Sequence, residues 1–124
     1  MKYRTFLLVT LSCLLLLNGC GNTNTYNISE SGNWKDGTYT ETAKGKKGDF
    51  EVYVTIKDGT ISEISVGDNQ ETPDKGGVVI DTLPGQMLER QTYDIDAISG
   101  ATVTSDALKD AVARCLEQAS GEEN

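Results

Sequence analysis

The sequence predicts a small α+β domain in which helices cover one face of an antiparallel sheet of three to four strands. Residues 50–56 alternate between apolar and polar, which indicates a half-buried strand with one apolar face, made by Phe50, Val52, Val54 and Ile56. Asp58-Gly59 predicts a hairpin turn over 57–60, because this pair tolerates positive φ angles. Apolar residues then recur at helical spacing near the end of the chain, at Leu108, Ala111, Val112, Cys115, Leu116 and Ala119.

The chain begins with a segment typical of a secretory signal. Lys2 and Arg4 precede an apolar run over 6–17, which is too short to cross a bilayer as a helix. The run ends shortly before Gly19-Cys20, an arrangement that resembles a bacterial lipobox. We expect residues 1–19 to be removed and Cys20 to carry lipid, which holds the protein to the outer face of the cytoplasmic membrane or to another extracytoplasmic membrane surface. A cleaved signal without lipid is the alternative.

Residues 20–33 are predicted to form the lipid anchor and a flexible tether, because Asn, Ser, Thr and Gly dominate them. The folded domain is then expected over 34–119, and residues 120–124 are expected to fray. Within the domain, a strand over 38–43 and a turn over 45–48 precede the alternating strand. In the next strand, the alternation of apolar residues shifts by one position between Ile61 and Ile64. This shift predicts either a bulge or a longer turn.

The second half of the domain is predicted to be mainly helical. A polar loop over 67–77 leads into a short helical turn over 78–82. Pro84 then suits the first position of a helix that runs to about Gln91. We expect the helical conformation to be interrupted at Pro84-Gly85, because proline disrupts a helix interior. Tyr93 and Ile95 form a short strand or an extended lead-in. The last helix is expected to begin near Thr104 or Ser105, with Asp106 in its first turn.

Composition excludes several classes of function. Without residues 1–19, the chain has nine basic and 19 acidic residues, so its formal charge is −10. Nucleic-acid binding is therefore not expected. The sequence contains no histidine, which removes the common haem and zinc ligand and the usual catalytic triads. Cys115 is the one cysteine left after Cys13 and Cys20, so an iron–sulfur cluster is excluded. Redox chemistry here requires an organic cofactor.

The segment Asp96–Ser105 is the strongest candidate for a binding site. Ser99, Gly100 and Ala101 are small, and Thr102, Thr104 and Ser105 offer hydroxyls where a helix is expected to begin. The start of a helix presents unpaired N–H groups and a partial positive charge, which together favour a phosphate. An ordinary turn followed by a Ser/Thr helix cap is the alternative.

Asp96, Ser99-Gly100-Ala101-Thr102 and Thr104 together resemble the flavinylation motif of the FMN-binding domain family. This family occurs in covalent-flavin subunits of sodium-pumping and Rnf-type redox complexes and in extracytoplasmic lipoproteins, and the resemblance runs from about 36 to about 119. It implies that an FAD-dependent flavin transferase joins the FMN phosphate to the Thr102 hydroxyl as a phosphoester. The neighbouring Ser99, Gly100, Ala101, Thr104 and Ser105 are then expected at the cofactor, and Asp96 in transferase recognition or in the turn.

The same resemblance assigns a second loop to the flavin. Glu71-Thr72-Pro73 matches part of a family loop that approaches the cofactor, although Asp74 stands where the family often has glycine. The residues that contact the flavin ring are not ranked by the sequence; the candidates are Trp34, Pro73, Met87 and Tyr93.

Three functions remain open at this stage. The first is a lipid-anchored electron carrier with covalent FMN, which accepts electrons from a membrane redox donor and has no catalytic residues of its own. The second is the FMN-bearing module of a multi-subunit flavin-dependent reductase. The third is a flavin-free lipoprotein that binds a ligand or another protein. No metal site is expected in any of them.

Overall fold

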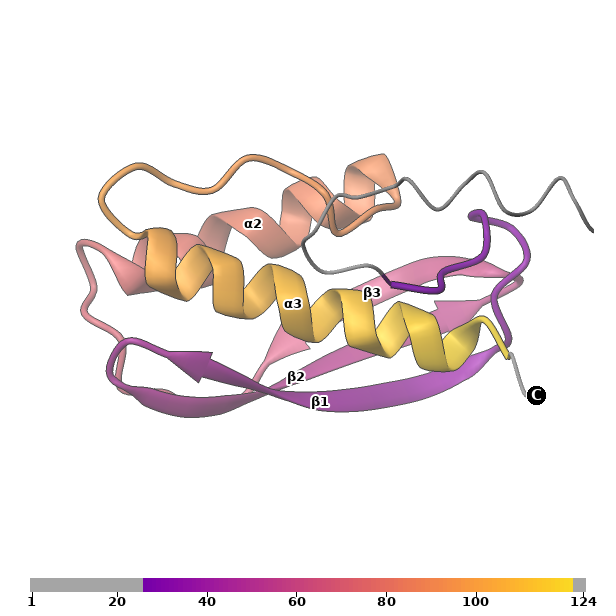
Figure 1. Ribbon diagram of the computed structural model, residues 1–124, viewed down its shortest axis with the longest axis horizontal. Helices are drawn as coiled ribbons and strands as arrows, with labels where there is room; N and C mark the ends of the chain where they lie inside the picture. Colours follow the sequence, from indigo (N-terminus) through magenta and orange to yellow (C-terminus); the bar gives the residue numbers. More distant parts are fainter. Residues whose placement is uncertain (1–25, 122–124) are drawn as a thin grey trace, which may run out of the picture.

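The structure is a computed structural model that describes residues 26–121. Strands β1 (Gly37–Gly45), β2 (Gly48–Lys57) and β3 (Thr60–Val66) form one antiparallel sheet in the order β1-β2-β3. Helices α2 (Gly76–Arg90) and α3 (Thr102–Ala119) lie side by side over one face of this sheet (Figure 1). The predicted α+β class is therefore confirmed, with three strands. None of the helices in the described part of the chain is long and apolar enough to cross a membrane.

The core lies between the sheet and the two helices. The predicted apolar face of β2 is buried: Phe50 is 3% exposed, Val52 and Val54 are fully buried, and Ile56 is 2% exposed. Burying each such side chain contributes about 1.5–3 kcal/mol, so this alternation is sufficient to fix which face of the sheet the helices cover.

The hairpin between β2 and β3 also forms as predicted. Asp58 and Gly59 have φ angles of 55° and 80°, as a type I′ turn requires at both central positions. A register shift follows: Ile56 pairs with Ile61 and Thr55 pairs with Glu63, so Ser62 is the extra residue of a β-bulge. This bulge explains the phase slip in the apolar pattern of β3.

Helix α2 contradicts one prediction. It runs unbroken over Gly76–Arg90 with Pro84 inside it, so the predicted break at Pro84-Gly85 and the separate turn over 78–82 are both wrong. The cause is a continuous buried stripe of Val79, Leu83 and Met87, each at most 1% exposed. A proline inside a helix costs about 3 kcal/mol. A break in the helix beside Leu83 would move these three side chains out of line, and their burial stabilises the fold by more than the proline costs.

Helix α3 begins at Thr102, so the expected start at Thr104 or Ser105 is two or three residues too late. Asp106 consequently falls outside the first turn, which contains no acidic residue. The Ser105 hydroxyl is not a cap, because it accepts a hydrogen bond from the Ile98 N–H at 3.0 Å. The lead-in around Tyr93 and Ile95 is a loop, with Ile95 buried in the core.

The tether predicted over 20–33 lies partly within the described residues, and that part contacts α3. Tyr26 donates a hydrogen bond to Asp110, and the Ser29 N–H donates to the Ser120 hydroxyl at 2.7 Å. Ile28 packs against the core. Figure 1 shows this segment running along α3 before the chain enters β1. The signal over 1–19, the lipid site Cys20 and residues 122–124 of the predicted tail lie outside the described residues.

Candidate functional site

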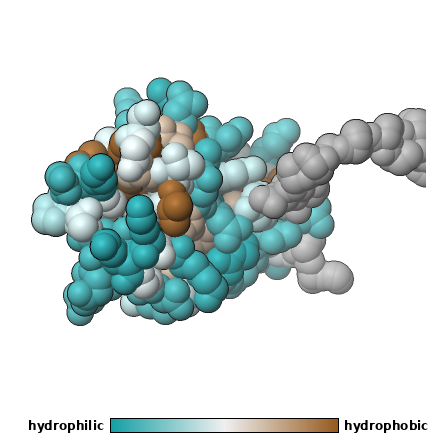
Figure 2. Space-filling view, turned by 60° about the vertical axis from the view of Figure 1, so that its left-hand side comes forward, coloured by the Kyte–Doolittle hydropathy of each residue, from teal (hydrophilic) through white to brown (hydrophobic). Residues whose placement is uncertain are grey.

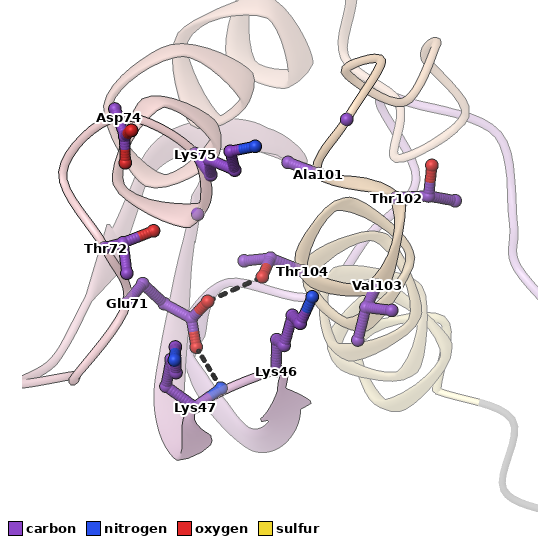
Figure 3. A pocket seen from close by; sticks show the side chains of 12 residues that line it. Lys46, Lys47, Glu71, Thr72, Asp74, Lys75, Ala101, Thr102, Val103 and Thr104 are labelled. Atoms are coloured by element: carbon purple, nitrogen blue, oxygen red, sulfur yellow. Dashed lines mark hydrogen bonds between the residues drawn. The ribbon is translucent and has the colours of Figure 1, made fainter.

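A cleft of about 560 Å³ lies at the end of the domain where α3 begins. Three segments far apart in the sequence meet there: the turn between β1 and β2, the loop that enters α2, and the start of α3 (Figure 3). The lining residues are Lys46, Lys47, Glu71, Thr72, Asp74, Lys75, Gly76, Gly100, Ala101, Thr102, Val103 and Thr104. The cleft therefore joins the predicted motif to the predicted 71–73 loop, apart from Pro73.

Thr102 lies at the rim of this cleft as the first residue of α3. Its side chain is exposed, and Figure 3 shows it directed away from Glu71. The preceding residue, Ala101, provides no side-chain cap for the helix. The N–H groups of the first turn are consequently left for an external acceptor, and the helix dipole makes that acceptor preferably an anion.

Glu71 fixes the geometry of the cleft. Its carboxylate accepts the Thr104 hydroxyl at 2.6 Å through Oε1 and the Lys47 N–H at 3.1 Å through Oε2. Gly45 and Gly76 make room for it, since a Cβ at these positions would lie 2.4 and 2.2 Å from the two carboxylate oxygens. Glu71 thus ties the β1–β2 turn and the start of α3 to its own loop.

Three lysines line the cleft on an otherwise acidic domain. Lys46 and Lys47 come from the β1–β2 turn, Lys75 precedes α2, and all three are exposed. Within residues 26–121 none of them forms an ion pair. Their charge more than offsets that of Glu71 and Asp74, so the cleft attracts an anionic group.

The sequence did not predict that these lysines belong to the site. The segment over 45–48 has the composition of an ordinary basic turn, and about fifty residues separate it from the motif. No signal in the sequence marks these lysines as part of the site, because only the folded chain gathers three of the nine basic residues after Arg4 around one cleft.

The other predicted site residues take different positions. Gly100 and Ala101 line the cleft, and Gly100 has a φ angle of 85°, which favours glycine there. Thr104 and Ser105 are buried, and their hydroxyls bond to Glu71 and to the Ile98 N–H. Ser99 lines a smaller neighbouring groove of about 190 Å³. Pro73 is exposed outside the cleft, and Asp96 is exposed in the loop before the motif.

The donors in the cleft suit a phosphate rather than a metal ion. No group of three metal-ligating side chains exists among residues 26–121. An exposed hydroxyl, an uncapped helix start and three lysines instead match what a phosphate ester needs. Fold and site together define a small α+β domain with a cleft suited to an anionic group at the start of its last helix.

Comparison with known proteins identifies the family. The FMN-binding domain family model matches residues 45–117, more than half of the 124-residue chain. The chain belongs to the FMN-binding domain family, as its motif suggested, and this membership supports a flavin-related redox role.

Three curated relatives share the matched region. The chain is 36% identical over 88 residues to an NADH:acrylate oxidoreductase of Vibrio harveyi, and 33% identical over 79 residues to a urocanate reductase of Eggerthella lenta. It is 31% identical over 84 residues to an uncharacterized protein of Treponema pallidum. These alignments cover 71%, 64% and 68% of this chain, but 9%, 13% and 23% of the respective relatives. The chain thus spans less than a quarter of each relative's length.

A solved structure supports the fold. The CPE2226 protein of Clostridium perfringens superposes with a TM-score of 0.57, covering 69% of this chain and 88% of that one. The sequence identity of 24% limits this likeness to the arrangement of helices and strands.

Proposed function

We propose that the protein is an electron carrier whose FMN is covalently bound to Thr102 through a phosphoester. The observation that carries this proposal is the position of the Thr102 hydroxyl, which is exposed, begins an uncapped helix and borders a cleft with three lysines. The phosphodiester keeps one negative charge, and the helix start and the lysines offset it. A bound flavin would supply the redox chemistry, because among residues 26–121 the cysteine, Cys115, is free and buried.

Attachment is proposed to require an FAD-dependent flavin transferase. The Thr102 oxygen attacks the flavin-side phosphorus of FAD, an Oγ–P bond forms, and the pyrophosphate P–O bond breaks with AMP as the leaving group. The hydroxyl proton passes to a base of the transferase. The small residues Ser99, Gly100 and Ala101 leave the approach to Thr102 open, and exposed Asp96 is available for recognition by the transferase.

Covalent attachment keeps FMN on a protein that works outside the cytoplasm. A reversible site loses its ligand by mass action where free FMN is scarce, and a phosphoester removes that equilibrium. We propose that Cys20 carries the lipid, that a membrane redox donor supplies electrons, and that the domain works at an extracytoplasmic membrane surface. Detergent partitioning and mass analysis of the N-terminal peptide, with Cys20→Ser as the unlipidated control, test the anchor separately from the flavin.

A second candidate function is an FMN-bearing module that works with a catalytic partner. The relatives named as an acrylate oxidoreductase and a urocanate reductase favour it, because in both the matched region is a small part of a longer protein. Reduction of an acceptor by the purified chain with a chemical electron donor separates the candidates. A module reduces unsaturated acids such as acrylate once its catalytic partner is added, whereas a pure carrier leaves them unreduced with or without that partner.

The attachment site is tested by co-expression with a flavin transferase and intact-mass measurement after denaturation. The wild-type chain and Thr102→Ser are expected to carry one FMN moiety, because both offer a hydroxyl at this position. Thr102→Ala is expected to lack the mass increment of FMN while retaining its fold. Thr72→Ala, which removes another hydroxyl of the same cleft, is the matched control and is expected to keep the flavin.

A further inference from the structure

We propose that residues 26–33 form a docked strap that turns the helical side of the domain towards the lipid surface and keeps the outer face of the sheet away from it. The inference rests on the proposed lipid at Cys20 and adds which surface of the domain meets the membrane. It follows from the contacts of the strap and from the length of chain between the strap and Cys20.

The strap follows α3 from the middle of the helix to its end. Tyr26 donates its hydroxyl hydrogen to Asp110, and the Asn27 N–H donates to the Glu117 carboxylate at 3.1 Å. The Ser29 N–H then bonds to the hydroxyl of the residue that follows the helix. Successive strap residues are therefore fixed along one side of α3.

Further contacts hold the second half of the strap. Ile28 packs against the core, and the indole N–H of Trp34 donates to the Ser29 carbonyl at 2.9 Å. The Gly32 N–H donates to the Gly59 carbonyl at 2.8 Å. This approach is close, since a Cβ at Gly59 would lie 2.3 Å from the Gly32 oxygen. The strap is thus part of the folded domain, although its composition predicts a flexible tether.

Asp110 is held in position to receive Tyr26. Arg114 Nε donates to Asp110 Oδ2 at 3.0 Å, and Arg114 also forms an ion pair with Glu41 of β1. The other oxygen, Oδ1, accepts the Tyr26 hydroxyl, while the Tyr26 ring packs edge-on against Tyr93 at a centroid distance of 5.3 Å. Burial and the bond to Asp110 raise the pKa of Tyr26, so its hydroxyl remains a donor.

The docked strap leaves a short span of chain between the lipid and the domain. Cys20 and Tyr26 are six residues apart, so the chain between them reaches about 20 Å when fully extended. A domain of this length has a radius of gyration of about 12 Å and hence a diameter of about 30 Å. The span is therefore too short to pass round the domain and bring its far side to the lipid.

A released strap would remove this restriction. The span would then run from Cys20 to Trp34, which is fourteen residues and reaches about 48 Å when extended. Because this length exceeds the diameter of the domain, any face could meet the membrane. Docking of the strap is consequently the step that gives the anchored domain an orientation.

The outer face of the sheet is the side that the docked strap keeps away. Val52 and Val54 point into the core, so Tyr53 between them points outward, as does its cross-strand partner Thr40. Figure 1 shows α2, α3 and the strap together on the other side of the sheet. The strap therefore starts on the helical side, and the lipid is tied to that side.

An apolar surface of the domain does not compete with the strap. Among residues 26–121, the large hydrophobic side chains classed as exposed are Val78, at 38%, and Val103, at 53%. Figure 2 shows apolar side chains standing among hydrophilic ones at the cleft end of the domain. Insertion into a bilayer requires a continuous apolar face, so these side chains do not set the orientation.

The orientation has a consequence for the proposed function. Thr102 precedes Asp110 by eight residues of α3, which is about 12 Å along the helix axis. The proposed attachment residue therefore stays near the membrane in which the proposed redox donor lies, and the outer face of the sheet points to the aqueous phase.

Hydrogen exchange of the strap amides tests the docking in the full-length chain. Tyr26→Ser/Ile28→Ser removes both side-chain anchors and is expected to speed exchange over residues 26–33 by about tenfold or more. Asn27→Ser/Glu30→Ser is the matched control, because it changes two exposed side chains of the same segment. It should exchange as slowly as the wild type, and equal exchange in all three proteins overturns the docking.

Fluorescence quenching tests the orientation on phosphatidylcholine vesicles that contain a headgroup spin label. A red-emitting thiol-reactive fluorophore is placed at Asp94→Cys, next to Tyr93 on the helical side, or at Thr40→Cys on the outer face. Cys115 is buried and takes no label. We expect several-fold stronger quenching at position 94 than at position 40, and similar quenching at both in the Tyr26→Ser/Ile28→Ser background.

The outcomes separate the strap from the lipid. A wild-type chain that does not float with the vesicles refutes the lipid at Cys20 and the orientation with it. A chain that floats but is quenched equally at both positions overturns the orientation alone. Asp110→Ala repeats the release from the helix side and is expected to reduce the difference, whereas Asp106→Ala, one turn earlier, should preserve it. The same difference in both variants overturns the role of Asp110.

Discussion

The hydroxyl of Thr104 donates a hydrogen bond to Glu71 at 2.6 Å and thereby ties the start of α3 to the loop that enters α2. Thr104 is 2% exposed, so its hydroxyl is occupied within the fold. Thr102, two residues earlier, is exposed on the rim of the cleft. Two threonines of one motif therefore differ in their surroundings: the Thr104 hydroxyl shapes the cleft, whereas the Thr102 hydroxyl, proposed above to carry FMN, is open to solvent.

Thr104→Val is expected to lower the free energy of unfolding by about 1–2 kcal/mol, because it leaves the Glu71 carboxylate without one of its two donors. Urea unfolding of the purified protein measures this change. FMN attachment should persist, since the Thr102 hydroxyl is intact. A folded Thr104→Val protein that takes up no flavin would show that Thr104 acts in attachment itself.

Gly76→Ala is expected to destabilise the domain by about 1–3 kcal/mol, because its Cβ would lie 2.2 Å from the Glu71 carboxylate and displace it. Gly85→Ala is the matched control in the same helix, since a Cβ there meets nothing within 4 Å. This control should stabilise the protein by up to about 1 kcal/mol through its better helix propensity. The two urea midpoints should move in opposite directions, and a shared direction would contradict the packing described for Glu71.

Cys115 is expected to resist alkylation in the native protein. Burial, with a smaller effect from the charge of Glu41, raises the pKa of its thiol from 9.0 to about 12. Folding therefore favours the protonated thiol, and this contribution to stability is present below pH 9 and is lost as the pH rises towards 12. Iodoacetamide at pH 9 should leave the Cys115 peptide unmodified in the native protein and modify it fully in urea. Rapid native modification would show that the α3–sheet interface opens.

Local patterns predicted the sheet well because they are set by neighbours in the sequence. The alternation in β2 and the positive φ angles at Asp58 and Gly59 followed from such patterns, and the bulge near Ser62 is one of the two alternatives that the pattern left open. Tertiary packing decided what these patterns missed. Pro84 remains inside α2 because Val79, Leu83 and Met87 must face the core together.

The candidate site was predictable only in part. Resemblance located Thr102 and the 71–73 loop, and the structure brings the start of α3 to Glu71 and Thr72. The contribution of Lys46 and Lys47 could not be predicted, because only the closed fold brings the β1–β2 turn to the motif. The start of α3 was misplaced because Thr104 and Ser105 have the side chains of helix caps but bond elsewhere.

The most direct test of the account is the intact mass of the denatured chain after co-expression with a flavin transferase. The account predicts one FMN moiety on the wild-type protein, which peptide mapping places on Thr102, and none on a folded Thr102→Ala variant. A wild-type chain without the mass increment of FMN, or a Thr102→Ala chain that still carries the flavin, would contradict it.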